Sequence, residues 1–417
     1  MSINLHNYAK KNGIEYFFVS FVDMFGILRS KLVPSRAIDE IQSEGAGFAG
    51  FATWLDMSPS DPDMFGMPDG DSVIQLPWDK KIAWVACDLY MSGKPVEASP
   101  RVALKRQMEK AAKLGMYMKS GVECEYFLVN SNGTELSDLK DTQEKPCYDS
   151  SALMRRYDVI TEICDSMIEL GWNPYQNDHE DANGQFEMNW DFSDCLVTAD
   201  RHAFFKFMTK TIAEKNGLRA TFMPKPFTNL TGNGCHSHIS VWDKSGKKNL
   251  FHDKKDELGL SKTGYNFLGG IVHSADKMAA IFNPTVNSYK RINGSVTLSG
   301  ATWSPSSITW AGNNRTHMVR VPGPGRFELR LMASNPYLLQ AGSLMLGLDG
   351  VNNKRDPGKR LDINMYTEGH KAGKVKKLPL NLLDSIRNFD TSTIIREGFG
   401  NQFVDSYVKL KNKEWDL

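Results

Sequence analysis

The stretch GVECEYFLV (121–129) places Glu123 and Glu125 two residues apart in an otherwise apolar run. Because side chains alternate between the two faces of a strand, a strand here puts both carboxylates on one face. Four such faces meeting in one sheet would form a concave wall of carboxylates, imidazoles and guanidiniums, which suits divalent cations and phosphates. The other three stretches with this spacing are GQFEMNW (184–190), GCHSHISVW (234–242) and RFELRL (326–331).

The composition is that of an ordinary globular protein. Of the 417 residues, 41% are hydrophobic and 24% are charged, and this length exceeds the usual size of one hydrophobic core, so we expect two domains. The formal net charge of +1 argues against a nucleic-acid-binding surface or a polybasic membrane anchor.

Neither export nor membrane insertion is expected. No run approaches the roughly 18 apolar residues that span a bilayer, and the N-terminal segment MSINLHNYAKKNG lacks the apolar core of a signal peptide. The six cysteines are scattered, without a C-x-x-C pair, which indicates free thiols in a reducing compartment, the cytoplasm. Cys124 should face away from Glu123 and Glu125, and we interpret it as a core thiol.

A break at MSGKPVEASP (91–100) divides the chain. Before the break, residues 14–34 predict two strands joined by a turn at Asp23–Gly26, and KIAWVACDLY (81–90) predicts another strand. We therefore expect a small, sheet-rich N-terminal domain at 1–97.

After the break, helical apolar spacing recurs and alternates with the strands that carry the polar faces. The expected helices span 101–115, 154–171 and 201–217. This alternation predicts an α+β fold, with a curved sheet backed by helices in a larger domain at 98–417.

Taken singly, the polar faces are weak signals, because a Glu-x-Glu strand is more often a solvated face than a metal site. Their order is more specific. In this order the motifs resemble those of the glutamine synthetase family, in particular the branch of type III (rhizobial-kind) glutamine synthetases and γ-glutamylmethylamide synthetases. The motifs are GVECEYFLV, HEDANGQFEMN (179–189), GNGCHSHIS (232–240), NPTVNSYKR (283–291), SGATW (299–303), NNRTHMVR (313–320) and RFELR (326–330).

The resemblance implies a β-grasp-like N-terminal domain and a catalytic domain with a mainly antiparallel sheet. It also implies an ATP-dependent ligase that forms a γ-glutamyl amide through γ-glutamyl phosphate, with two Mg²⁺ or Mn²⁺ ions in each site. By this resemblance Glu125, Glu180 and Glu187 would hold one ion. Glu123, His236 and Glu328 would hold the other.

The same resemblance assigns the substrates. Arg315 and Arg330 would act as catalytic residues that meet the transferred phosphate and the γ-carboxylate of glutamate. Gly232 and Arg291 would bind the rest of glutamate. The expected ATP-binding residues are His238, Ser240, Arg320 and Arg326.

The amine site departs from the family pattern. Ala49 stands where an aspartate is expected, and Thr297 aligns with the flap glutamate. Asp63, as a catalytic acid, Tyr148 and Glu180 fall on matching positions. Losing the aspartate removes a charge and makes room for a methyl group, yet this branch includes members that make glutamine. Ammonium and methylamine therefore both remain open as the amine.

A ligase for a bulkier amine, such as isopropylamine or a polyamine, is also compatible with the motifs, and so is a non-catalytic structural or regulatory family member. The resemblance further implies a dodecamer of two hexameric rings, in which residues 45–72 of one subunit complete the neighbour's active site. The apolar side chains of this segment either line that interface or cover the core of their own domain. They are Phe48, Phe51, Trp54 and Met64.

Overall fold

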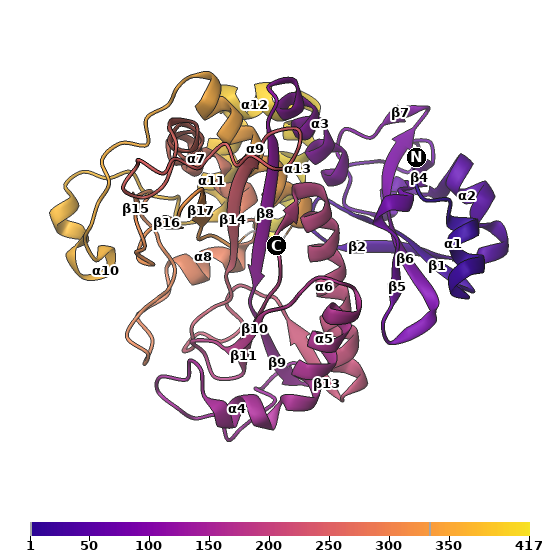
Figure 1. Ribbon diagram of the computed structural model, residues 1–417, viewed down its shortest axis with the longest axis horizontal. Helices are drawn as coiled ribbons and strands as arrows, with labels where there is room; N and C mark the ends of the chain where they lie inside the picture. Colours follow the sequence, from indigo (N-terminus) through magenta and orange to yellow (C-terminus); the bar gives the residue numbers. More distant parts are fainter. Residues whose placement is uncertain (1, 333–334) are drawn as a thin grey trace.

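The computed structural model describes residues 2–332 and 335–417, whose strands form three sheets with helices packed around them (Figure 1). The seven-stranded sheet belongs to the N-terminal part, drawn in indigo and purple, and the other two sheets belong to the rest of the chain. The expected α+β class is confirmed. None of the described helices has the length and apolar character needed to cross a membrane.

The N-terminal sheet is built on the long strand β6 (Asp79–Met91), which pairs in parallel with β1 (Tyr16–Val22) and antiparallel with β4 (Met64–Pro68). Its strand order is β2-β1-β6-β4-β3, and β5 and β7 also pair with β6. The remaining elements are β2 (Leu28–Pro34), β3 (Ala46–Phe48), β5 (Ile74–Leu76), β7 (Lys94–Pro95), α1 (Leu5–Asn12), α2 (Ile38–Glu44) and the short 3-10 helices Ser35–Ala37, Gly50–Ala52 and Gly70–Ser72.

The predicted turn between the first two strands is present. It is stabilised by the buried Asp23 carboxylate, which accepts hydrogen bonds from the backbone N–H groups of Phe25 and Ile27. All strands of this sheet end before residue 97, and the division into domains at 1–97 and 98–417 stays a prediction.

Two further sheets carry the polar motifs. The six-stranded sheet has the order β12-β8-β14-β17-β16-β15, and the four-stranded sheet has the order β10-β11-β9-β13. All their pairings are antiparallel except that of β15 with β16. Their bounds are β8 (Tyr117–Cys124), β9 (Tyr126–Asn130), β10 (Gln176–His179), β11 (Gln185–Asn189), β12 (Ser193–Asp194), β13 (Leu218–Thr221), β14 (Cys235–Trp242), β15 (Trp310–Ala311), β16 (Val319–Gly323) and β17 (Arg326–Leu329).

The expectation that the polar faces meet in a single sheet is wrong. The run 121–129 is divided at Glu125, between β8 of the six-stranded sheet and β9 of the four-stranded sheet. The backbone N–H of Glu125 still donates to Gly234 O (3.3 Å), whereas the next residue, Tyr126, already pairs with Phe186 of β11. Glu125 therefore lies at the junction of two sheets, which brings side chains from both to one place.

Helices back these sheets. The predicted helices appear as α3 (Pro100–Lys113), α5 (Tyr157–Glu169) and α6 (Cys195–Lys215), and α6 begins six residues earlier than expected, burying Cys195 and Ala199 in its first turns. α9 (Pro336–Asn352) is almost entirely buried against its neighbours. The other helices are α4 (Ser150–Arg155), α7 (Lys262–Phe282), α8 (Val286–Ile292), α10 (Met365–Glu368), α11 (Leu382–Asp390), α12 (Thr393–Phe399), α13 (Asn401–Asp416) and the 3-10 helix Gly369–Ala372.

A buried arginine ties the N-terminal sheet to these helices. Arg101, at the start of α3 and only 2% exposed, donates to Asp88 (2.6 Å) and Asp69 (2.8 Å) of the N-terminal part, and to Asp200 of α6 (3.1 and 3.0 Å). The Tyr337 hydroxyl of α9 donates to the same Asp200 carboxylate at 2.7 Å. One guanidinium thus neutralises carboxylates from three separate parts of the chain.

Replacing Arg101 with Met should lower the free energy of unfolding by about 3–5 kcal/mol, because it leaves the buried Asp200 carboxylate without its cation. Urea unfolding followed by circular dichroism measures the change. The matched control is Lys409→Met, which removes the ion pair between an exposed lysine and Asp56 and should change stability little. Equal effects of the two substitutions would contradict this account.

Candidate active site

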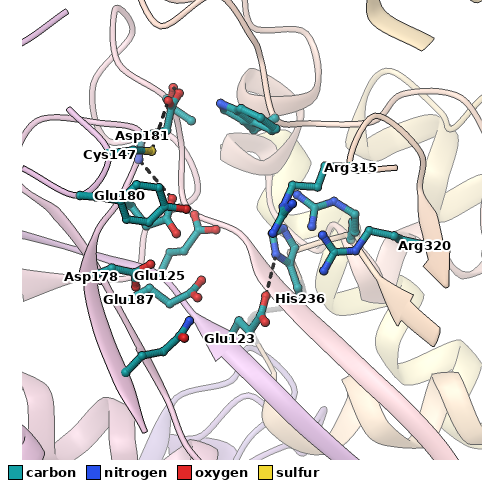
Figure 2. Close-up of a pocket in the computed structure, with 15 residues that line it drawn as sticks. Glu123, Glu125, Cys147, Asp178, Glu180, Asp181, Glu187, His236, Arg315 and Arg320 are labelled. Atoms are coloured by element: carbon teal, nitrogen blue, oxygen red, sulfur yellow. Dashed lines mark hydrogen bonds and ion pairs between the residues drawn. The ribbon is translucent and has the colours of Figure 1, made fainter. Parts of the chain in front are cut away.

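One acidic cavity collects half of the predicted site residues. Figure 2 shows carboxylates from Glu125, Glu180 and Glu187 on one side, Arg315 and Arg320 on the other, and Glu123 and His236 between them. The lining combines the end of β8, the β10–β11 hairpin, β14 and the segment around β16. Nine predicted residues line it: Glu123, Glu125, Tyr148, Glu180, Glu187, His236, Arg315, Arg320 and Arg330.

The first triad consists of Glu125, Glu180 and Glu187, each of which offers a carboxylate oxygen within 4.8 Å of the others. Glu125 Oε2 accepts from Gln185 Nε2 (3.1 Å) and from the Gly234 backbone N–H (2.7 Å). Glu187 Oε1 accepts from Asn189 Nδ2 at 2.9 Å. These donors are neutral, so they orient the triad without neutralising it.

Asp141 stabilises the β10–β11 hairpin that carries Glu180 and Glu187. The Asp141 carboxylate lies 2.6 Å from His179 Nε2 and accepts a hydrogen bond from the Gly184 backbone N–H at 2.7 Å. His179 is fully buried directly before Glu180. The HEDANG motif thus folds into a turn that presents Glu180 to the cavity.

Crowding governs protonation of this triad. Burial and the neighbouring carboxylates Glu125 and Asp178 raise the pKa of Glu180 well above its usual range, and burial together with Glu180 does the same to the pKa of Glu187. Burial and the charges of Glu123 and Glu125 raise the pKa of Asp178 to about 6. Without a cation, these carboxylates cannot all be ionised together at low cost.

The second triad consists of Glu123, His236 and Glu328, again with ligand atoms within 4.8 Å of one another. His236 Nδ1 lies 3.3 Å from Glu123 Oε2 and 3.5 Å from Glu328 Oε1. Burial opposes ionisation of Glu123, but hydrogen bonds with His236 and His238 outweigh it and lower its pKa. Burial likewise opposes ionisation of Glu328, but Arg330 and His236 lower its pKa.

Both triads fit a divalent cation. Carboxylate-rich sets suit hard ions such as Mg²⁺ and Mn²⁺, and a dication would relieve the crowding in the first triad. In the second triad, His236 Nδ1 faces both carboxylates and can serve as the nitrogen ligand. The grouping matches the two sets that the family resemblance implies, and their role as metal ligands stays a prediction.

Arginines line the opposite wall. Arg330 Nη1 donates to Glu328 Oε1 (2.6 Å), and Arg320 forms an ion pair with Glu328 Oε2 (2.5 Å), whereas Arg315 is exposed at the mouth. Guanidiniums bind phosphate oxygens through paired, planar donors. This wall can therefore receive the phosphates of a nucleotide.

Gly232 and Arg291 are adjacent, as their predicted common role requires. A Cβ on Gly232 would lie 2.2 Å from Pro224 O and 3.2 Å from Arg291 Cδ, so only glycine fits. Arg291 is buried, its Nη2 donates to Trp303 O (2.9 Å), and its Nε lacks a partner within the described part of the chain.

The predicted ATP-binding residues lie along the six-stranded sheet next to the second triad. His238 Nε2 is 2.9 Å from Glu123 Oε1, Ser240 Oγ accepts from Trp242 Nε1 (2.9 Å), and Arg326 is exposed at the start of β17. Of this set, Arg320 alone lines the acidic cavity, and the contact of all four residues with ATP stays a prediction.

The predicted amine-site residues divide into two groups. Tyr148 and Glu180 line the cavity, and Thr297 lies behind it, with its hydroxyl 3.2 Å from that of the lining residue Thr231. Ala49 and Asp63 are exposed on the N-terminal part and do not line the cavity of their own chain.

Sequence reasoning missed part of the lining. The Asp181 carboxylate accepts hydrogen bonds from the hydroxyls of Thr231 (2.7 Å) and Ser299. Cys147 Sγ lies 3.6 Å from the same carboxylate. Asp181 and Trp303 belong to the HEDANG and SGATW motifs, which indicate the family but give neither side chain a distinctive spacing. The missed lining residues are Cys147, Gln176, Asp178, Asp181, Thr231 and Trp303.

Two of the aromatic lining residues have strained backbones. Tyr148 has φ 65° and Trp303 has φ 51°, the left-handed region that bulky residues rarely adopt. Such conformations concentrate at functional sites, where surrounding contacts impose them. We infer that the surrounding contacts hold the Tyr148 and Trp303 rings at the cavity.

Comparison with known proteins agrees with this site. The model of the family "Glutamine synthetase, catalytic domain" matches residues 97–417. The chain is 60% identical to a glutamine synthetase of Rhizobium meliloti (strain 1021), over 100% of this chain and 96% of that protein. It is 41% identical to a glutamate–methylamine ligase of Methyloversatilis universalis, over 98% and 94% of the two chains. A solved GmaS/ADP complex superposes with a TM-score of 0.96 at 57% identity, covering 100% of this chain and 96% of that one.

Fold, cavity and relatives together define a carbon–nitrogen ligase. The chain belongs to the glutamine synthetase family.

Replacing Gln185 with Ala should weaken binding of Mn²⁺ about 10–100-fold, because Gln185 orients the Glu125 carboxylate without binding a metal itself. Titration followed by electron paramagnetic resonance measures free Mn²⁺ directly. Gln107→Ala is the matched control, since it removes a buried amide that donates to Gly398 O on α12, which contributes nothing to the cavity lining. Unchanged Mn²⁺ affinity in the Gln185 variant would argue against a metal site at the first triad.

Proposed function

We propose that this enzyme uses ATP to join L-glutamate to methylamine, forming a γ-glutamyl amide through γ-glutamyl phosphate. The observation that supports the reaction most directly is the single cavity in which the first triad, with Glu123 and His236 of the second, faces Arg315, Arg320 and Arg330. This combination of metal-binding carboxylates and phosphate-binding guanidiniums is what transfer of a phosphoryl group to a carboxylate needs.

In the first step the γ-carboxylate of glutamate attacks the terminal phosphorus of ATP and ADP leaves. Arg291, beside Gly232, binds the α-carboxylate of glutamate, while Arg315 and Arg330 hold the γ-carboxylate and the transferred phosphate. His238, Ser240, Arg320 and Arg326 bind ATP. Mg²⁺ or Mn²⁺ held by the two triads neutralises the phosphate oxygens when bound.

In the second step the amine attacks the acyl carbon and phosphate leaves. An alkylammonium ion must first lose a proton, and Glu180, together with Asp63 of a neighbouring subunit, is the proposed acceptor. No step requires a covalent bond to the enzyme.

The choice of methylamine rests on the side chains around Glu180. Ala49, contributed by a neighbouring subunit, and Thr297 are smaller than the acids of the family pattern, which leaves room for a methyl group. Tyr148 and Trp303 add aromatic surface beside the carboxylates, and aromatic faces bind alkylammonium groups well. Ammonium is the second candidate, favoured by the 60% identity to a rhizobial glutamine synthetase.

Phosphate release from ATP and glutamate, measured with ammonium, methylamine, isopropylamine and putrescine, tests the proposal. A pocket for one methyl group discriminates by about 10–200-fold, so kcat/KM for methylamine should exceed that for ammonium by about tenfold or more. No release with any amine would contradict the ligase. A higher value for ammonium would establish the second candidate, and preference for isopropylamine or putrescine would require a larger site.

Thr297→Glu supplies the matched variant for this measurement. The larger glutamate side chain should fill the space proposed for the methyl group and shift the preference toward ammonium. Ser295→Glu adds the same charge to the same segment but not at the aligned position, and should leave the preference unchanged.

We also propose that the subunits form a cytoplasmic dodecamer of two hexameric rings, with residues 45–72 completing a neighbour's site. Ala49 and Asp63 lie outside their own chain's cavity, and Phe51 and Trp54 are 60% and 40% exposed. Phe48 and Met64, by contrast, are buried in their own domain, so only part of this segment is available for an interface.

Co-expression of two inactive variants tests shared sites. Asp63→Ala and Glu187→Gln should each be inactive alone, yet mixed assemblies should regain activity, because some sites then combine two intact halves. Each variant expressed separately is the control. Mixed assemblies without activity, or a monomer by sedimentation, would exclude an active site built by two subunits.

A further inference from the structure

The strands that carry the catalytic ligands hold a second cluster on their opposite face. Cys124 of β8 is directly opposite Cys235 of β14 in the strand register, and their sulfur atoms are 3.7 Å apart. His202 of α6 places its Nε2 atom 3.9 Å from Cys235 Sγ. Two thiols and one imidazole thus converge from three elements that are far apart in the sequence.

The cluster is sealed from solvent. Cys124, Cys235 and His202 are 1%, 8% and 2% exposed. The Nδ1 atom of His202 has no hydrogen-bond partner among residues 2–332 and 335–417, and Nε2 is the ring nitrogen that faces Cys235. Lys206, one turn further along α6, interacts electrostatically with both sulfurs.

We propose that Cys124, Cys235 and His202 form a binding site for a thiophilic metal ion of the Zn²⁺ type. Their three ligand atoms lie within 4.8 Å of one another. Zn–S bonds of about 2.3 Å and Zn–N bonds of about 2.0 Å at tetrahedral angles place two sulfurs about 3.8 Å apart and sulfur and nitrogen about 3.5 Å apart. The observed 3.7 and 3.9 Å are within a few tenths of an ångström of these values.

The charges and donor types fit the same ion. Two thiolates neutralise one divalent cation, and the third donor is a neutral imidazole, as in Cys₂His zinc sites. Hard ions such as Mg²⁺ prefer the oxygen donors of the two triads. The two faces of the same strands therefore select different metals.

The consequence is mechanical. A metal here would clamp β8 to β14 and both strands to α6, at the residues adjacent to Glu123, Glu125 and His236. It would fix the spacing of the catalytic ligands from behind without entering the cavity.

The test uses the full-length, metal-depleted protein under anaerobic conditions, with the catalytic triads saturated with Mg²⁺. Added Co²⁺ should bind in one equivalent and give the near-ultraviolet thiolate-to-cobalt charge-transfer band that oxygen ligands cannot produce. One equivalent of Zn²⁺ should displace it and raise the melting temperature.

Cys124→Ser and Cys235→Ser should abolish the band, and His202→Gln, which keeps both thiols, should weaken Co²⁺ binding about tenfold or more. Cys195→Ser is the matched control, a buried cysteine of α6 outside the cluster, and should retain the band. Absence of the band in the wild-type protein, or its survival in Cys124→Ser, overturns the proposal. Recovery of Cys124 and Cys235 as a disulfide from anaerobically purified protein also overturns it, because the pair would then be a redox couple.

Discussion

Repulsion among like charges in one buried cavity is the constraint on which the rest of the structure depends. Glu123, Glu125, Glu180 and Glu187 come from two sheets, and a low dielectric makes their shared ionisation costly unless cations join them. The surrounding structure is arranged to support this cluster: neutral donors orient the carboxylates, Asp141 anchors the hairpin beneath them, and arginines neutralise Glu328 on the far wall. A divalent cation at the triads would relieve this repulsion.

The sequence predicted much of this and missed specific parts. Period-two spacing placed Glu123 beside Glu125 and His236 beside His238, because alternation along a strand is a local property. It could not reveal that the chain changes sheets at Glu125, since that depends on the partners chosen by Tyr126, which lie some 60 residues away in the sequence. Asp178 and Trp303 were missed for a related reason. An aspartate in a hairpin and a tryptophan in a loop have no distinctive spacing, and only the folded chain shows that both face the carboxylates.

Two separate sets of residues support the two halves of the proposed reaction. The triads and arginines are fixed by strands and by buried ion pairs, and they concern glutamate activation. The proposed amine-site residues lie in irregular segments. They are Tyr148, Thr297 and Trp303, and Ala49 and Asp63 in an exposed part of the N-terminal region. Loops tolerate substitution far better than paired strands. This separation explains how relatives of one fold can be named for different amines while they retain the same acidic cavity.

The strand pairings also set the order in which the sheets can form while the chain is synthesised on the ribosome. Every strand of the N-terminal sheet is synthesised within the first 95 residues, so this sheet can close early. The six-stranded sheet must wait for β17, which follows its partner β14 by more than 80 residues, and its edge stays unpaired meanwhile. Long-range antiparallel pairing is slow, and exposed edges are prone to aggregation. Growth temperature and chaperone supply should therefore affect correct folding of the larger, C-terminal part of the chain more than folding of the first hundred residues.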